Sequence, residues 1–374
     1  MKVLHVISDT NIGGAGILLC NLLTCFEREK IESTVALPCG SKLAPRLIKM
    51  GVSVLYLREP CERVSPNSVW ELSRIIQKRK VDIVHTNAAV SARVAAKLCH
   101  VPVLHTRHCC FPPSGVLTNP VVRCVAGFGN RMLSDHVIAT ADAAAENLRQ
   151  LGIPERKITT IINGSLPVRE VDEAVLDETR KRFGIQKEDF TVGICARLEE
   201  CKGHDTFLKA AAILRQSQPN IPFRFLIVGE GSRRDYLEEM TVELGLADCV
   251  TFTGFVRDMA PVYRILRVNV NCSSGTETSC LAISEGMSVG LPIIASNYGG
   301  NAAMIGESGA GFLFDVGDAE ALANAILQIA VNEELEKQMK ARSRERYLSH
   351  FTAEKMTREV EHVYQNLVKR KSRS

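Results

Sequence analysis

The sequence has no long apolar run. No stretch of its 374 residues approaches the ~18 consecutive apolar residues of a membrane-spanning helix. The first ten residues, MKVLHVISDT, contain no basic segment and only a short apolar run, so we expect no signal peptide. The net charge of +4 is too small to call for nucleic acid as a partner, although it permits attraction to an anionic substrate or an anionic lipid surface.

Metal and disulfide patterns are also missing. The 13 cysteines are scattered, and several, including Cys20, Cys99 and Cys272, lie inside apolar segments. They form no C-x-x-C repeat, and the pair Cys109–Cys110 after His108 has nothing beside it to complete a zinc site. We therefore expect free thiols in a reducing cytosol, no metal site and no bound cofactor.

The fingerprint of a dinucleotide-binding oxidoreductase is incomplete. After the first predicted strand, Lys2–Ser8, residues Asn11–Gly16 read NIGGAG, which is not G-x-G-x-x-G. The second predicted strand ends at Leu37–Pro38 and carries no carboxylate for a ribose. These glycines still let the backbone turn tightly and approach a ligand, and a plain turn between strand and helix is the alternative interpretation.

The alternation of strands and helices predicts the fold class. Short β-branched runs such as Asp82–Thr86 alternate with helix-period segments such as Asn67–Arg79 along the chain, which is too long for one typical core. We therefore predict an α/β protein with two doubly wound, Rossmann-like domains that face a cleft. The predicted parts are an N-terminal domain over 1–167, a linker over 168–187, a C-terminal domain over 188–350, and a last helix at about 352–370 that packs back on the first domain.

The stretch Asn271–Gly300 carries the strongest chemical signal. A helix predicted over Ser279–Val289 would begin with the backbone N–H groups of Thr278, Ser279, Cys280 and Leu281, and such groups favour a phosphate. Glu277 precedes this helix and Glu285 lies on it, eight positions later. A carboxylate accepts two hydrogen bonds at once, so it suits the paired hydroxyls of a sugar or a ribose.

This stretch resembles the signature of the family-4 retaining glycosyltransferases, which have the GT-B fold. Their signature is a glutamate, seven residues, a second glutamate, a Gly-x-Pro turn, a strand and a Gly-Gly pair; here it reads Glu277, Glu285, Gly290–Leu291–Pro292 and Gly299–Gly300. A strand–helix–strand with two surface glutamates is the alternative, but the Gly-Pro and Gly-Gly pairs in register favour the family.

Two cations follow the first predicted strand of the second half. Arg197 and Lys202, five positions apart, can clamp a diphosphate and offset the charge that develops on a leaving group. A solvated basic turn is the alternative. The resemblance favours the clamp, because the family has Arg and Lys-Gly at this place, as Lys202–Gly203 here.

The resemblance also implies further site residues. It assigns Gly13 and Gly14 to a loop facing the donor diphosphate and the acceptor, His108 to the reacting sugar, and Val256 to the nucleotide base. His85, at the end of the preceding strand, and Gly229, in a G-x-G after a strand, match recurrent family positions.

Three positions depart from the family pattern, and the first and the last of them leave the identity of the sugar unassigned. Thr278–Ser279 replaces the usual Gly-Phe, Gly286 stands where alanine is usual, and Ala303 replaces a glutamate.

The resemblance implies a retaining, metal-independent transfer of a sugar from a nucleotide-diphosphate donor, more often UDP than GDP, to an acceptor hydroxyl. Arg197, Lys202, Glu277 and His108 would be the catalytic residues. The implied acceptor is a saccharide, in bacteria commonly lipid-linked, which fits a cytoplasmic enzyme with peripheral contact to the membrane. Residues 111–132 could meet such an acceptor or simply cover the cleft. A nucleotide-sugar 2-epimerase of the same fold and a non-catalytic sugar-nucleotide binding protein are the alternatives.

Overall fold

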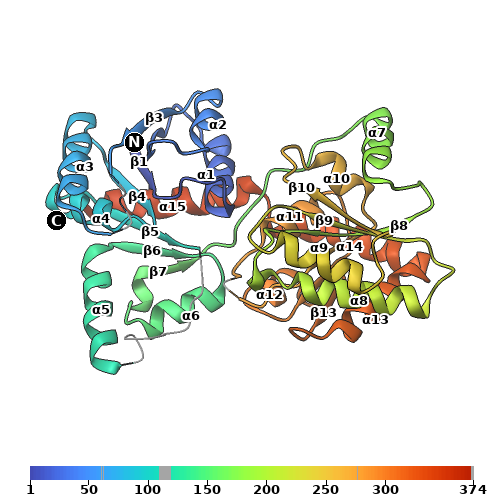
Figure 1. The fold of residues 1–374 in the computed structure, drawn as a ribbon. Coiled ribbons are helices and arrows are strands. Elements are labelled where there is room, and N and C mark those ends of the chain that lie inside the picture. The colour runs from blue at the N-terminus through green and yellow to red at the C-terminus, as the bar shows by residue number, and fades with distance from the viewer. Residues whose placement is uncertain (60, 62, 109–118, 276, 372–374) are drawn as a thin grey trace. The chain divides into compact units, whose positions relative to one another are not determined.

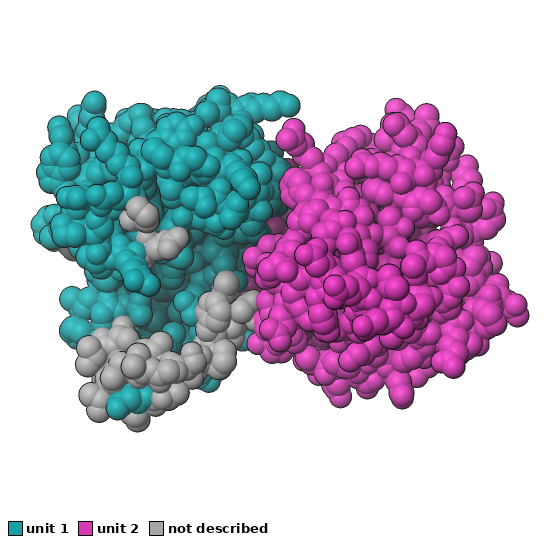
Figure 2. Space-filling view, viewed as in Figure 1, with its two compact units in different colours: residues 1–164, 353–374 teal, residues 165–352 magenta. Residues whose placement is uncertain are grey.

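The computed structural model describes residues 1–59, 61, 63–108, 119–275 and 277–371. The chain divides into two compact units (Figures 1 and 2). Unit 1 comprises Met1–Gly164 and Ala353–Ser374, and unit 2 comprises Ser165–Thr352. Of residues 111–132, which are expected to meet an acceptor or cover the cleft, 111–118 lie outside the described residues.

In the described part of unit 1, seven strands form one parallel sheet in the order β3-β2-β1-β4-β5-β6-β7. Val3, Leu4 and Val6 of β1 are almost completely buried, as expected for a central strand covered on both faces. The strands are β1 (Lys2–Ile7), β2 (Glu32–Pro38), β3 (Ser53–Leu57), β4 (Ile83–Asn87), β5 (Val103–Arg107), β6 (His136–Ala139) and β7 (Ile158–Thr160).

The helices of unit 1 connect these strands, and one of them comes from the end of the chain. They are α1 (Gly14–Cys25), α2 (Ala44–Lys49), α3 (Pro66–Arg79), α4 (Val90–Leu98), α5 (Pro120–Leu133), α6 (Asp142–Gln150) and α15 (Ala353–Lys371). α15 packs beside α1 (Figure 1). Its Tyr364 is fully buried and lies 2.6 Å from Nδ1 of His85 on β4, so the last helix is tied to the sheet by a buried polar contact.

In the described part of unit 2, six strands form a second parallel sheet in the order β10-β9-β8-β11-β12-β13. Its core is rich in phenylalanine: Phe207 and Phe225 meet edge to face, with ring centroids 5.8 Å apart. The strands are β8 (Phe190–Cys195), β9 (Phe223–Val228), β10 (Val250–Gly254), β11 (Val268–Asn271), β12 (Ile293–Ser296) and β13 (Gly311–Phe314).

The helices of unit 2 cover both faces of this sheet. They are α7 (Glu173–Phe183), α8 (His204–Ser217), α9 (Arg234–Glu243), α10 (Ala260–Ile265), α11 (Leu281–Ser288), α12 (Asn301–Ile305), α13 (Ala319–Ala330) and α14 (Glu333–His350). The sequence thus correctly predicts the fold class: two parallel sheets with helices, each sheet with a reversal of strand order at its first strand.

The segment predicted as a linker, 168–187, contains helix α7. Leu176 and Phe183 of α7 are buried while most of the helix is charged and exposed. α7 packs against α10 within unit 2 and ends at Gly184, which takes the left-handed conformation common after helices. The two buried apolar residues of α7 stand among many charged residues, so the sequence shows no clear apolar face that would predict a helix here.

The described helices include none that is long and apolar enough to cross a membrane. Ten of the cysteines in the described ranges are free thiols; the side chain of Cys124 is not described.

The contact between α15 and the sheet can be tested with Tyr364→Phe, which removes only a hydroxyl. We expect the variant to lose about 1–3 kcal/mol of unfolding free energy, because Nδ1 of His85 would be left buried without its partner. Urea unfolding followed by circular dichroism measures the loss. Tyr236→Phe is the matched control: Tyr236 is exposed and its hydroxyl meets Asp205 at the surface, so the change should stay within about 0.5 kcal/mol. Equal stability of the two variants would contradict the assignment.

Candidate functional site

The strand order of unit 2 reverses between β8 and β11, which is where ligands of doubly wound sheets bind. The loop after β8 and the loop after β11 lie against each other there. The N–H of Ser274 donates to the carbonyl of Cys201 at 2.9 Å. At Gly203, where φ is +67°, a Cβ atom would lie 2.1 Å from the carbonyl oxygen of Cys272, so only glycine fits.

Lys202 and Glu277 meet at this point. The Nζ of Lys202 donates to Oε2 of Glu277 at 2.6 Å, and both side chains are largely buried, with 17% and 10% exposed. The hydroxyl of Ser273 donates to the same oxygen at 2.8 Å. Burial lowers the pKa of Lys202, but the Glu277 carboxylate more than offsets this, so the pKa is raised and the ammonium stays charged.

Gly299, of the Gly-Gly pair, fits directly against the Glu277 backbone. Its φ is +59°, and a Cβ atom there would lie 2.1 Å from the carbonyl oxygen of Glu277. The glycine at position 299 therefore has a steric reason, because the loop after β12 approaches the loop after β11 too closely for any side chain.

The helix after Glu277 begins later than the sequence predicts. α11 starts at Leu281 with Cys280 as its N-cap, so Thr278 and Ser279 precede the helix and are buried loop residues. The N–H of Cys280 donates to the sulfur of Met304 at 3.2 Å. The prediction that all four N–H groups from Thr278 to Leu281 form the helix N-terminus is therefore wrong for the first two, which precede the helix and its N-cap.

Glu285 lies on α11 and meets the hydroxyl of Tyr263 on α10. That hydroxyl donates to Oε2 of Glu285 at 2.8 Å, and Tyr263 is 1% exposed. Burial and the negative charge of Glu285 raise the pKa of Tyr263 well above its usual value, so the tyrosine keeps its proton. Cys195, at the end of β8, is within hydrogen-bond reach of the same hydroxyl.

The glycine at 286, where the family usually has alanine, is explained by packing. A Cβ atom on Gly286 would lie 2.6 Å from Nδ2 of Asn269, whose amide donates to the carbonyl of Ala282 at 2.8 Å. The buried Asn269 on β11 occupies the space that an alanine methyl would need.

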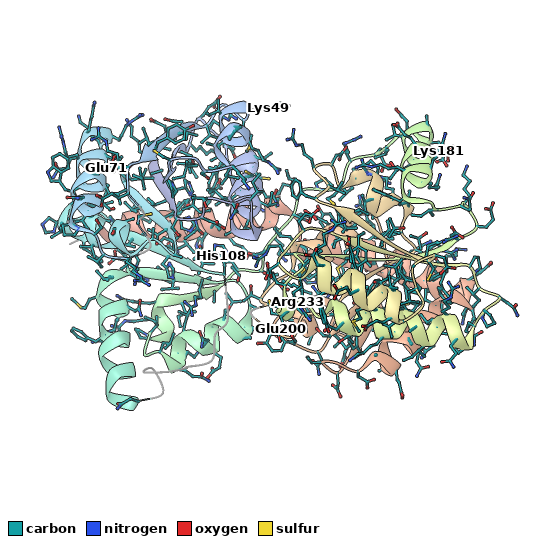
Figure 3. All side chains as sticks on the ribbon, in the orientation of Figure 1. Lys49, Glu71, His108, Lys181, Glu200 and Arg233 are labelled. Carbon is teal, nitrogen blue, oxygen red and sulfur yellow. The ribbon has the colours of Figure 1, made fainter. Side chains whose placement is uncertain are left out.

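The other residues predicted in unit 2 lie at the same edge of the sheet, with fewer contacts. Arg197 is exposed, and no hydrogen bond among the described residues joins its guanidinium to Lys202 or Glu277. A Cβ atom on Gly229 would lie 2.1 Å from the carbonyl oxygen of Ala196, so this glycine lets the end of β9 approach the end of β8. Val256 is half-buried in the loop after β10. Figure 3 labels Glu200, in the short 3₁₀ turn that ends at Lys202.

In unit 1, the predicted glycines lie at the start of α1. Gly13 is the N-cap residue of α1 and Gly14 its first residue. A Cβ atom on Gly13 would lie 3.2 Å from a carboxylate oxygen of Asp9, whereas Gly14 has open space around it. The loop is therefore tight at Gly13 and open at Gly14.

His108 follows β5 and contacts the end of β4 (labelled in Figure 3). Its Nε2 lies 2.5 Å from Oδ1 of Asn87, and burial lowers the pKa of His108 to about 4. The ring is therefore neutral at pH 7, and Nε2 donates its proton to the amide oxygen. The two side chains line a small cavity of unit 1 whose apolar wall includes Leu18, Met356 and Val360.

His85 on β4 has both ring nitrogens in contact with other side chains. It is 4% exposed, and its ring nitrogens lie 2.6 Å from the Tyr364 hydroxyl and 2.7 Å from Oγ1 of Thr106. It also lines the same cavity as His108 and Asn87. The substrate-binding role expected for His85 stays a prediction.

Sequence reasoning missed Ser273 and Tyr263, the two hydroxyl donors to the glutamates. In the sequence, Ser273 stands in the polar run Ser273–Ser274–Gly275, which is typical of a loop, and a tyrosine in the apolar segment APVYRI has the appearance of a core residue. Among the described residues, no group of three or more His, Cys, Asp or Glu side chains is arranged to hold a metal ion.

Two family descriptions match the chain. Residues 12–165 match "Glycosyltransferase Family 4", and residues 176–346 match "Glycosyl transferases group 1". These ranges coincide with most of the first sheet and most of unit 2.

Curated relatives cover most of the chain. The N-acetyl-alpha-D-glucosaminyl L-malate synthase of Bacillus anthracis is 23% identical over 80% of this chain and 78% of its own length. The UDP-Gal:alpha-D-GlcNAc-diphosphoundecaprenol alpha-1,3-galactosyltransferase of Escherichia coli is 25% identical over 85% of this chain and 84% of its own length.

Solved structures share the fold over nearly the whole chain. Anabaena Alr3699/HepE in complex with UDP has a TM-score of 0.84 at 20% identity and covers 98% of this chain and 100% of its own. The sucrose-phosphate synthase of Thermosynechococcus elongatus has a TM-score of 0.80 at 21% identity and covers 98% of this chain and 99% of its own. The fold is GT-B, and with both family descriptions matched the chain belongs to the family-4 glycosyltransferases.

Proposed function

We propose that this glycosyltransferase moves a sugar from a UDP-sugar to a hydroxyl of a lipid-linked saccharide, with retention of anomeric configuration and without a metal. The observation that carries the proposal is the ion pair of Lys202 and Glu277 at the strand-order reversal of unit 2. UDP in the Anabaena structures supports the choice of nucleotide, and the diphosphoundecaprenol named for the Escherichia coli relative supports the choice of acceptor.

The donor roles follow from charge and position. Lys202, with Arg197 from the same loop, would hold the diphosphate, together with the first backbone N–H groups of α11. A diphosphate would compete with Glu277 for the ammonium of Lys202. Glu277 would then accept hydrogen bonds from donor-sugar hydroxyls. Glu285, about one turn along α11, would accept the hydrogen bonds of the ribose, with the backbone of Val256 near the base.

The reaction needs no side chain as nucleophile. The bond between the anomeric carbon and the β-phosphate oxygen breaks, and the acceptor oxygen bonds to the same face of that carbon. The acceptor proton passes to the departing phosphate oxygen, and Lys202 and Arg197 stabilise the negative charge on UDP.

We assign acceptor binding to unit 1. Gly14 offers open backbone at the start of α1, and the neutral ring of His108 is held by Asn87 at the carboxyl ends of β4 and β5. A neutral imidazole can hydrogen-bond a sugar hydroxyl without adding charge. A lipid-linked acceptor would bring the enzyme to the membrane surface as a peripheral protein.

The charge of Lys202 can be tested with Lys202→Gln, which keeps an N–H donor for Glu277 and removes the positive charge. We expect kcat to fall about 100-fold or more because the leaving diphosphate loses its main cation. UDP release measures turnover, and a thermal melt checks the fold. Lys209→Gln, an exposed lysine on α8, is the control and should keep full activity. An unchanged kcat in Lys202→Gln would remove this residue from the mechanism.

The nucleotide role of Glu285 can be tested with Glu285→Ala. Loss of a charged acceptor for the ribose hydroxyls should raise the Kd for UDP about tenfold or more, as measured by calorimetry. Glu239→Ala, an exposed glutamate on α9, should bind UDP as the wild type does. Equal affinity in both variants would refute the assignment.

The reaction class can be tested by NMR of the product. A thermal-shift panel of UDP- and GDP-sugars first identifies the donor, because binding stabilises the folded state. An α-linked donor should then give an α-linked product in the presence of EDTA. Inversion, loss of activity with EDTA, or conversion of the donor without an acceptor, as in a 2-epimerase, would each contradict the proposal.

A further inference from the structure

The two glutamates of the site are each held by one buried hydroxyl. Ser273 donates to Oε2 of Glu277 at 2.8 Å, and Tyr263 donates to Oε2 of Glu285 at 2.8 Å. Each of the two hydroxyl-bearing side chains is 1% exposed. They come from different elements, the loop after β11 and helix α10.

Ser273 is itself fixed by a buried polar network. Its N–H donates to Oδ1 of Asn271 at 3.0 Å, and its carbonyl accepts from the hydroxyl of Ser296 at 2.6 Å. The amide of Asn301, which is 0% exposed, donates to both Asn271 and Ser296. These bonds join the ends of β11 and β12 with the start of α12. The Ser273 hydroxyl therefore has a fixed direction, toward Glu277.

Tyr263 is fixed by packing. Tyr263 of α10 is buried, and its hydroxyl donates to the carboxylate of Glu285 at 2.8 Å. A buried hydroxyl that keeps its proton can only serve a carboxylate as a donor. It therefore fixes the rotamer of Glu285 from the side of α10.

We propose that Ser273 and Tyr263 are positioning residues that act on different parts of the donor. Ser273 orients Glu277 toward the sugar, and Tyr263 orients Glu285 toward the nucleotide. The inference rests on the proposed function and adds to it a separation of sugar recognition from nucleotide recognition. A residue that holds only the sugar-facing carboxylate affects turnover and leaves UDP binding intact. A residue that holds only the ribose-facing carboxylate affects UDP binding and leaves turnover at saturating donor intact.

The test is a crossed comparison of two variants that each remove one hydroxyl. Tyr263→Phe should raise the Kd for UDP about tenfold and change kcat at saturating donor by no more than about threefold. Ser273→Ala should lower kcat about tenfold and leave the Kd for UDP within about twofold. Calorimetry with UDP and turnover with the donor found for the wild type supply the two readouts.

Ser284→Ala is the matched control. Ser284 is fully buried on α11, but its hydroxyl donates to the carbonyl of Leu281 in its own helix and to neither glutamate. Its kcat and its Kd for UDP should both stay within about twofold of the wild type. Ser273→Cys, which keeps a weaker donor in nearly the same space, should lie between wild type and Ser273→Ala in kcat, and it serves as the second variant if the alanine variant does not fold.

The outcomes separate the inference from the function on which it rests. A wild type that neither binds UDP nor turns over any nucleotide sugar defeats the proposed function before a variant is made. An active wild type with crossed effects in the two variants supports the division. Variants that both match Ser284→Ala, or that both lose UDP affinity and kcat in the same proportion, overturn it, because the hydroxyls would then have no role or only a general structural one.

Discussion

The ion pair between Lys202 and Glu277 is the interaction on which the site of unit 2 depends. It joins two loops that are 75 residues apart in the sequence and adjacent in space. Both side chains are largely buried, and a buried charge without a partner of opposite charge is costly. Each side chain therefore requires the other while no anionic ligand is present. The pair keeps a cation and a carboxylate ready at the point where a doubly wound sheet binds ligands.

Close backbone approach makes this pair possible. Gly203 lets the first loop lie on the carbonyl of Cys272, and Gly299 lets the loop after β12 lie on the carbonyl of Glu277. A Cβ atom at either position would fall 2.1 Å from an oxygen atom, so neither loop could keep its place. The glycines of the Lys-Gly and Gly-Gly pairs therefore allow the close backbone approach that positions the charged side chains.

The sequence predicts the fold class well because two periodicities dominate it. Buried runs such as Val3–Val6 alternate with amphipathic helices, and this pattern requires parallel sheets in two cores. The sequence does not indicate helix α7, because this helix buries only Leu176 and Phe183. The start of α11 is predicted too early, because the motif alone does not show that Thr278 and Ser279 belong to a loop.

The motifs named Lys202 and Glu277, and the structure brings these two side chains together; their roles toward a ligand stay predictions. Contacts made by distant parts of the chain could not be predicted from the motifs. The contact of His85 with Tyr364 of the last helix is one of them. The hydrogen bonds from Tyr263 to Glu285 and from Ser273 to Glu277 depend on the folded backbone, and no sequence motif indicates them.

A crystal structure of the protein with UDP would test the central claim most directly. The account predicts that the diphosphate lies at the carboxyl ends of β8 and β11, within hydrogen-bond distance of the Nζ of Lys202, with the ribose against Glu285. UDP bound elsewhere on the chain, with the Lys202–Glu277 pair intact and untouched, would contradict it.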